Sequence, residues 1–193
     1  LYDSRDDIAV ITRSVVSKVS FLNEYTDKEK DNLGKYSSNL FTLNTFYSSI
    51  KRTIKGNTPS DSTLSFLCKY WNCVASNIIQ WNELNKKEIS KVDLRENYIV
   101  TQGVVIQAIG QVGSYFINNA EINMYEILKG LRNIDWRRSA SIWKNRVIRA
   151  DGKILTSNKA ILLASNQIKK ELGIPLLPDE ELKEKRYLES LTI

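Results

Sequence analysis

Apolar side chains recur at steps of three and four residues along most of this chain, which is the spacing of one face of an α-helix. The clearest stretch covers residues 61–81, where the apolar positions are Leu64, Leu67, Cys68, Trp71, Val74, Ala75 and Ile78. Similar stripes predict helices over residues 8–19, 40–54 and 158–172. We therefore expect a mainly α fold, arranged like a helical bundle, with residues 1–193 in a single domain.

Capping residues place the ends of several helices. Ser60 or Asp61 can cap the helix over 61–81, and Ser157 or Asn158 can cap the helix that ends at Gly173. A last helix of mixed charge is expected to begin near Pro178, with its charged side chains in solvent. Residues 121–133 predict a short helix whose inward side chains are Tyr125, Leu128 and Leu131.

A long apolar helix is predicted to open at the capping box of Asp93 and Glu96 and to reach about Ile117. It contains Gly103, Gly110 and Gly113 near one face. Because each interior glycine costs about 1 kcal/mol relative to alanine, we expect these glycines to admit a closely packed neighbouring helix. A nucleotide-binding loop is the weaker interpretation, since the glycines follow no predicted strand.

Positive charge is concentrated in one part of the chain. The net charge is +6, yet residues 129–170 hold eleven Lys and Arg against two Asp, so the remainder is net negative. Within this part, VIRADGKILT predicts a small β-hairpin near residues 147–156 that turns at Asp-Gly. The basic hairpin-helix segment spans residues 134–173.

A hairpin that leads into a capped helix brings together three features that bind phosphate: basic side chains, hydroxyl and amide donors, and the helix N-terminus. The first hypothesis is therefore binding of duplex DNA, mainly through its phosphates. The alternative is a protein-docking module in which the same basic patch contacts an acidic partner without direct DNA contact. The candidate site residues are Arg137, Arg138, Lys144, Arg146, Arg149, Lys153, Ser157, Asn158 and Lys159.

Three other residues of this segment allow two interpretations each. Trp136 and Trp143 could stack on bases, but tryptophans of a folded domain more often anchor a core. Asp135 could be a catalytic carboxylate, but an isolated acid among so many cations more often pairs with Arg137, Arg138 or Arg146. We therefore expect structural roles for all three.

Residues that are missing exclude several chemistries. The chain has no histidine, which excludes Ser-His, Cys-His and His-metal sites within it. Its acids are scattered, so we expect no enzyme activity, no metal and no cofactor. Cys68 and Cys73 are too far apart on one helix for a disulfide, which favours a reduced, cytoplasmic protein with both thiols buried. No apolar run is long enough for a membrane span, and the first residues resemble neither a signal peptide nor a natural start, so a fragment of a longer protein is expected.

Three stretches resemble the C-terminal half of the DndB family, which belongs to bacterial DNA phosphorothioate modification systems. They are residues 1–16, 33–47 and 134–181. One position differs, since Asn145 stands where the family usually has glycine, although asparagine also tolerates a left-handed backbone. The matching positions are Tyr2, Asp3, Arg5, Asp6, Ser38, Leu40, Phe41, Thr42, Leu43, Asp135, Trp136, Ser139, Trp143, Arg146, Gly152, Lys153 and Ile154.

The resemblance implies an accessory protein that represses or tunes its own modification operon rather than one that transfers sulfur. It implies duplex DNA of the operon promoter as partner, and other DNA sulfur modification proteins as further candidates. The histidine-containing motif of the wider family is absent and is expected in an N-terminal half. Homo-oligomerisation stays open.

Overall fold

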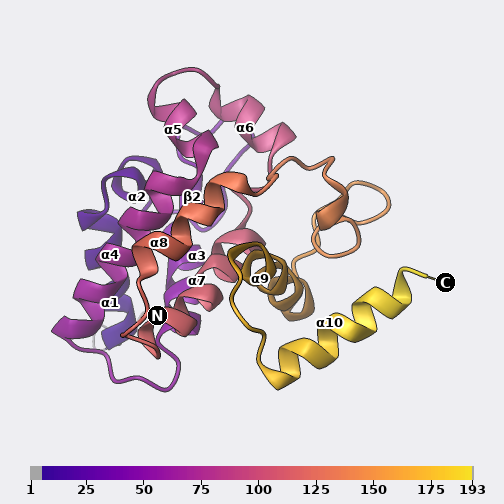
Figure 1. Cartoon of the computed structure of the whole chain (residues 1–193). Coiled ribbons are helices and arrows are strands. Elements are labelled where there is room, and N and C mark those ends of the chain that lie inside the picture. The colour runs from indigo at the N-terminus through magenta and orange to yellow at the C-terminus, as the bar shows by residue number, and fades with distance from the viewer. Residues whose placement is uncertain (1–5, 193) are drawn as a thin grey trace.

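The computed structural model describes residues 6–192, and within them the fold is mainly helical, as predicted (Figure 1). The α-helices are α1 (Asp7–Lys18), α2 (Ser20–Tyr25), α3 (Leu43–Thr53), α4 (Asp61–Asn77), α5 (Ile79–Asn85), α6 (Lys91–Asn97), α7 (Gly103–Ile117), α8 (Met124–Leu128), α9 (Asn158–Leu172) and α10 (Pro178–Ser190). Two 3-10 helices are η1 (Lys129–Asn133) and η2 (Ser141–Trp143). Two short strands, β1 (Thr26–Asp27) and β2 (Phe41–Thr42), pair in parallel.

Helix α7 lies at the centre of the fold and packs against both α3 and α9. Nine of its residues are buried, in agreement with its almost continuous apolar sequence. The core built around it contains buried side chains from Ile11 in α1 to Ile174 after α9. Burial of this apolar surface is the main force that holds the helices together.

The predicted close approach at the α7 glycines is confirmed for Gly110 and Gly113. A methyl group on Gly110 would overlap the backbone of Ser49 in α3, and one on Gly113 would lie 3.0 Å from carbons of both Thr53 and Tyr70. The short distance lets α3 donate to main-chain carbonyls of α7. Ser49 Oγ donates to the carbonyl of Ile106 at 2.8 Å, and Thr53 Oγ1 donates to that of Gly110 at 2.6 Å. Gly103 makes only ordinary contacts and does not share this role.

Two of the predicted helices are interrupted. The helix predicted over 61–81 ends at Asn77, and a separate helix, α5, begins at Ile79. The helix predicted to open at Asp93 is instead α6, which is capped by the hydroxyl of Ser90 and ends at Asn97. After α6 the backbone is extended at Tyr98, which bridges Arg137, and the N–H of Ile99 donates to the carbonyl of Trp136 at 3.0 Å before a turn leads into α7.

The predicted hairpin is wrong in extent and in register. It forms no strand, only one antiparallel bridge between Ile148 and Ile154. The N–H of Arg149 donates to the carbonyl of Lys153 at 2.8 Å, so the loop contains three residues rather than the Asp-Gly pair alone. Gly152 is the loop residue with a positive φ, of 83°, as in a type I turn followed by a bulge.

The cysteines are both free, as expected, but only Cys73 is buried. Cys68 is partly exposed on α4. Burial raises the pKa of both thiols. Within residues 6–192 no helix has the length and apolar character that a bilayer span requires.

Candidate nucleic-acid interface

The basic segment begins with a pair of buried tryptophans. The rings of Trp136 and Trp143 are stacked, with centroids 5.5 Å apart and planes 10° apart. Both side chains are almost completely buried, and Nε1 of Trp143 donates to the carbonyl of Asp135 at 2.6 Å. The expected core role is confirmed, and neither ring is available to stack on a base.

Asp135 pairs with Arg137, which confirms the expected ion pair. Arg137 donates through Nε at 2.9 Å and through Nη2 at 2.6 Å. The hydrogen bond from Arg137 lowers the pKa of Asp135 from its ordinary value, although burial opposes the effect. Both carboxylate oxygens of Asp135 thus accept from one guanidinium, as in the bidentate pairs that arginine commonly forms.

The segment then forms a tight turn after η2, in which Asn145 has a φ of 58°. The N–H of Asn145 donates to the carbonyl of Ile148 at 2.7 Å, and that of Ile148 donates to the carbonyl of Trp143 at 3.0 Å. The left-handed conformation explains why glycine suits this position and why asparagine can replace it.

Arg146 was expected on the surface, and this is wrong. Its side chain is only 2% exposed. Its two terminal nitrogens donate to the carboxylate of Glu184 at 2.7 and 2.8 Å, and its guanidinium lies 4.1 Å from the centre of the Tyr187 ring. Both partners belong to α10, whose expected solvent exposure at Glu180 and Glu184 is also wrong. In this structure Arg146 anchors α10 and is not available to DNA.

Arg138 is partly buried. Its Nη2 donates to the carbonyl of Arg95 at 3.0 Å, and burial lowers its pKa. Arg149 is exposed, but it pairs with Asp151 in the turn at 2.7 Å. Exposed pairs of this kind contribute about 0–1 kcal/mol, so a phosphate can replace the carboxylate at little cost.

The N-terminus of α9 is open to solvent. Ser157 caps it as predicted, because its hydroxyl accepts from the N–H of Ala160 at 3.1 Å. Asn158 and Lys159 are exposed, and the first turn has no acidic residue. The positive end of the helix dipole is therefore not neutralised by a carboxylate of its own.

Arg52 of α3 also belongs to this site, and the sequence did not indicate it. Its Nη2 donates to Oδ1 of Asn158 at 2.8 Å, while Nε and Nη1 donate to Gln107 and Gln111 of α7 at 3.3 Å. Burial lowers its pKa. All three partners are more than fifty positions away, so no local pattern could have predicted the contact.

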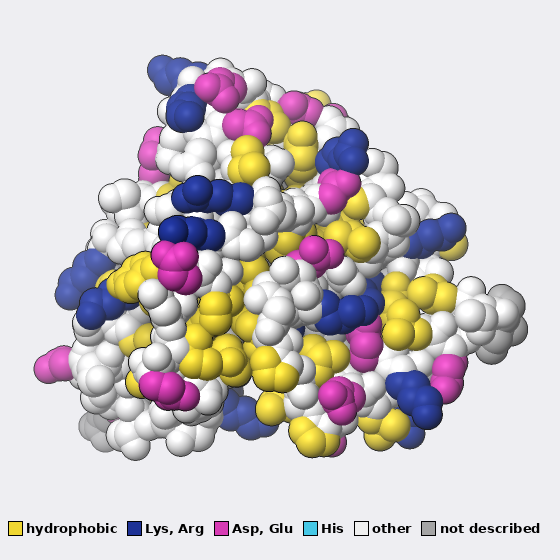
Figure 2. All heavy atoms as spheres, viewed as in Figure 1, with side chains coloured by type: hydrophobic (Ala, Val, Ile, Leu, Met, Phe, Trp, Pro, Cys, Tyr) yellow, Lys and Arg dark blue, Asp and Glu magenta, His cyan; other side chains and the backbone are white. Residues whose placement is uncertain are grey.

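The structure thus divides the nine predicted residues. Arg146 is buried and Arg138 is partly buried, whereas the exposed residues are Arg137, Lys144, Arg149, Lys153, Ser157, Asn158 and Lys159. Over the described range 6–192, Lys144, Lys153 and Lys159 form no ion pair. The part of the segment before α9 is the orange loop on the right of Figure 1, and Figure 2 shows Lys and Arg side chains in separate groups on this face.

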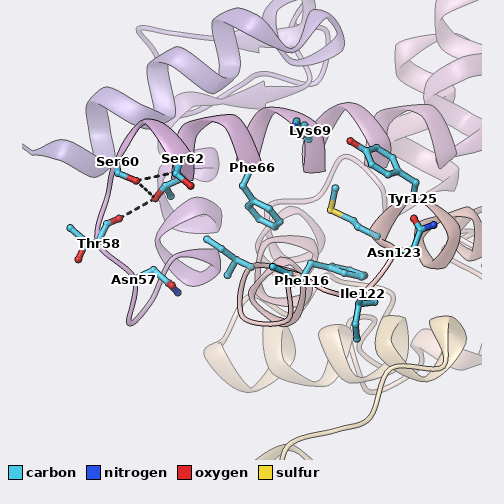
Figure 3. Close-up of a pocket in the computed structure, with 14 residues that line it drawn as sticks. Asn57, Thr58, Ser60, Ser62, Phe66, Lys69, Phe116, Ile122, Asn123 and Tyr125 are labelled. Atoms are coloured by element: carbon cyan, nitrogen blue, oxygen red, sulfur yellow. Dashed lines mark hydrogen bonds between the residues drawn. The ribbon is translucent and has the colours of Figure 1, made fainter.

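A separate hollow lies between α4 and α8 (Figure 3), and yellow apolar side chains gather near α8 in Figure 2. Its volume is about 550 Å³. Phe66, Phe116, Ile122, Met124 and Tyr125 form its apolar wall, and Asn57, Thr58, Ser60 and Ser62 form a polar end. Tyr125 was expected to face inward, but it is 52% exposed at the edge of this hollow.

The start of the chain contains part of the resemblance, but Tyr2, Asp3 and Arg5 lie outside the described residues. Asp6 caps α1, and the hydroxyl of Tyr47 donates to its Oδ2 at 2.7 Å. This hydrogen bond lowers the pKa of Asp6. No three His, Cys, Asp or Glu side chains gather as metal ligands within the part of the chain that the structure describes.

The sequence matches the DndB family, described as DNA-sulfur modification-associated, over residues 1–175. The chain belongs to the DndB family. Membership associates it with DNA sulfur modification, as the resemblance implied. Searches of curated proteins and of solved structures gave no match. The matched residues end before α10, which begins at Pro178.

Proposed function

We propose that this DndB-family chain is a cytoplasmic, non-enzymatic regulatory protein that binds duplex DNA of its own operon promoter. Contact is made mainly with phosphates, through the exposed cations of residues 137–159 and the N-terminus of α9. Family membership supports the association with DNA modification.

The observation on which the proposal depends is the open N-terminus of α9. It presents main-chain N–H groups and the exposed Lys159, lacks an acid in its first turn and adjoins Arg52. Lys144 and Lys153 add positive charge from the preceding turns. Such an arrangement attracts phosphate oxygens but does not distinguish bases, so we expect weak sequence preference from this surface alone.

The test is a triple variant, Lys144→Ala, Lys153→Ala and Lys159→Ala, measured by fluorescence anisotropy with promoter and unrelated duplexes at several salt concentrations. Each lost phosphate contact flattens the slope of log affinity against log salt by about 0.9. We expect the triple variant to bind both duplexes more weakly and to flatten the slope by between two and three units.

The matched control replaces Lys18, Lys69 and Lys86, which lie on α1, on α4 and at the end of α5. All three are exposed and form no ion pair within residues 6–192. It removes the same charge and should keep most of the salt slope. If the first triple variant remains folded and binds at low salt as tightly as the parent, the proposed surface is wrong.

A second candidate function is docking of another DNA modification protein, and the hollow between α4 and α8 favours it. Tyr125 is exposed and lines the same hollow as Phe66, which is typical of an aromatic anchor position, whereas Trp136 and Trp143 are buried and cannot serve as anchors. Tyr125→Ala distinguishes the two functions, because it should weaken docking and leave DNA affinity unchanged.

A further inference from the structure

Helix α10 places its acids inward and its leucines outward. The buried residues of α10 are Glu180, Glu184 and Tyr187. Leu182 and Leu188 of the same helix are 49% and 45% exposed. A helix that is held by apolar packing has the opposite arrangement, so α10 is attached mainly by charge and hydrogen bonds.

The carboxylate of Glu184 is surrounded by donors from outside α10. Besides the two bonds from Arg146, it accepts from Lys170 at 3.2 Å and from Asn166 at 3.3 Å. Both of these residues belong to α9. One anionic group thus receives four hydrogen bonds from three side chains, an arrangement that also suits a phosphate.

The second inward acid repeats the pattern one turn earlier. Glu180 accepts from Lys169 of α9 at 2.7 Å, and this ion pair is almost completely buried. Glu180 also accepts from the N–H of Leu177 at 2.9 Å, which fixes the start of α10. Two carboxylates of α10 therefore cover two cations of the rest of the chain, Arg146 and Lys169, and pair with a third, the exposed Lys170, at the edge of the contact.

Such an attachment is readily exchanged for another anion. When a buried ion pair separates into water, both partners recover hydration, which offsets much of the lost attraction. Leu182 and Leu188 are about half exposed, so they lose little packing when the helix leaves, whereas the buried Tyr187 ring loses its contact with Arg146. A polyanion that arrives at the same cations replaces the carboxylates without a net loss of ion pairs.

We propose that the surface beneath α10 is a second phosphate-binding surface, and that α10 is an acidic stand-in for the DNA backbone which duplex DNA displaces. Displacement exposes Arg146 and Lys169 and frees the already exposed Lys170 from its pair with Glu184. The inference rests on the proposed DNA-binding function and adds a regulatory step to it.

Duplex DNA is the favoured occupant because this surface continues into the first one. The hydroxyl of Tyr187 in α10 donates to the carbonyl of Lys144 at 2.8 Å, so α10 ends beside a residue of the exposed basic segment. A duplex seated on Lys144 thus lies next to the cations that α10 covers. The alternative polyanion, an acidic protein, would not require this continuity.

The test compares two double variants of α10 with the same charge change. Glu180→Gln with Glu184→Gln weakens the inward attachment but retains an acceptor for the N–H of Leu177. Glu181→Gln with Glu189→Gln alters exposed acids of the same helix. We expect the inward variant to bind duplex DNA about tenfold more tightly than the outward variant, with a salt slope steeper by two to three units.

Because unpaired cations could unfold the inward variant, Tyr187→Ala provides a second test. It loosens α10 without leaving a charge unpaired, and Leu188→Ala is its exposed control. A third measurement needs no variant: in the parent, amide hydrogens of residues 178–190 should exchange faster when duplex is added.

The outcomes separate this inference from the proposed function. The inference is wrong if the parent binds duplex, the inward and outward variants bind with equal affinity, and amide exchange of α10 does not change on binding. The proposed DNA-binding surface of residues 137–159 is then retained. If the parent fails to bind but the inward variant binds, the covered surface is the DNA site and the exposed one is wrong. If no variant binds, both proposals are overturned.

Discussion

Replacing Trp143 tests whether the basic segment is held by its tryptophan pair. The side chain is fully buried, stacks on Trp136 and donates to the carbonyl of Asp135. Trp143→Ala therefore removes apolar burial, a ring contact and a hydrogen bond at once. The segment between η1 and α9 has few other large anchors, so little rearrangement can fill the space.

The expected loss follows from these three contributions. Truncation of a buried aromatic side chain to alanine costs about 3–5 kcal/mol, which already includes the ring contact of about 0.5–1.5 kcal/mol. The carbonyl left without its donor adds about 1–3 kcal/mol unless water reaches it. We expect a free energy of unfolding lower by about 5 kcal/mol. Trp143→Phe keeps most of the burial and should lose about 2 kcal/mol.

The assay is equilibrium urea unfolding followed by far-UV circular dichroism, because removal of a tryptophan alters fluorescence directly. Tyr36→Ala is the control, since Tyr36 is 79% exposed and should change the free energy by less than about 0.5 kcal/mol. A loss below about 1 kcal/mol for Trp143→Ala would refute the assignment of Trp143 as the anchor of this segment.

Two further predictions concern α7 and α10. Gly110→Ala should destabilise the protein by about 3 kcal/mol or more in the same urea unfolding assay, because the added methyl meets the Ser49 backbone. Gly103→Ala, whose methyl meets only ordinary contacts, should be neutral or stabilising. For Glu184, burial raises the pKa, but the hydrogen bond and charge of Arg146, with help from Lys170 and Asn166, lower it overall. A lowered folded pKa stabilises above the unfolded value, so the stability difference between parent and Glu184→Gln should shrink as pH falls below about 4.5; a difference that stays constant down to pH 3 would contradict this assignment.

The helices could be predicted from the sequence because their signals are local. The apolar stripe of α4, the Ser157 cap and the stop at Gly173 depend on neighbours within one or two turns. The break between α6 and α7 could not be predicted, because it depends on a hydrogen bond from Ile99 to the distant carbonyl of Trp136.

The candidate site was predicted only in part for the same reason. Charge counting identifies where cations are concentrated, but it does not indicate which of them the fold neutralises. Arg146 and Lys169 are paired with acids of a later helix, and Arg52 joins the site from an earlier one. The Asp-Gly pair correctly predicted a turn. Its register could not be predicted, because it depends on whether both residues or only Gly152 has a positive φ.

The contact between α3 and α7 also determines how the molecule can deform. The hydroxyls of Ser49 and Thr53 donate to main-chain carbonyls of α7, so sliding one helix along the other by a turn would break both hydrogen bonds at once. We therefore expect α3 and α7 to move as one rigid unit. Arg52 belongs to this rigid unit and donates to Asn158, so a ligand that binds at the start of α9 contacts a part of the protein that deforms little. The contact between α9 and α10 depends on ion pairs, and we expect conformational change on ligand binding to occur there.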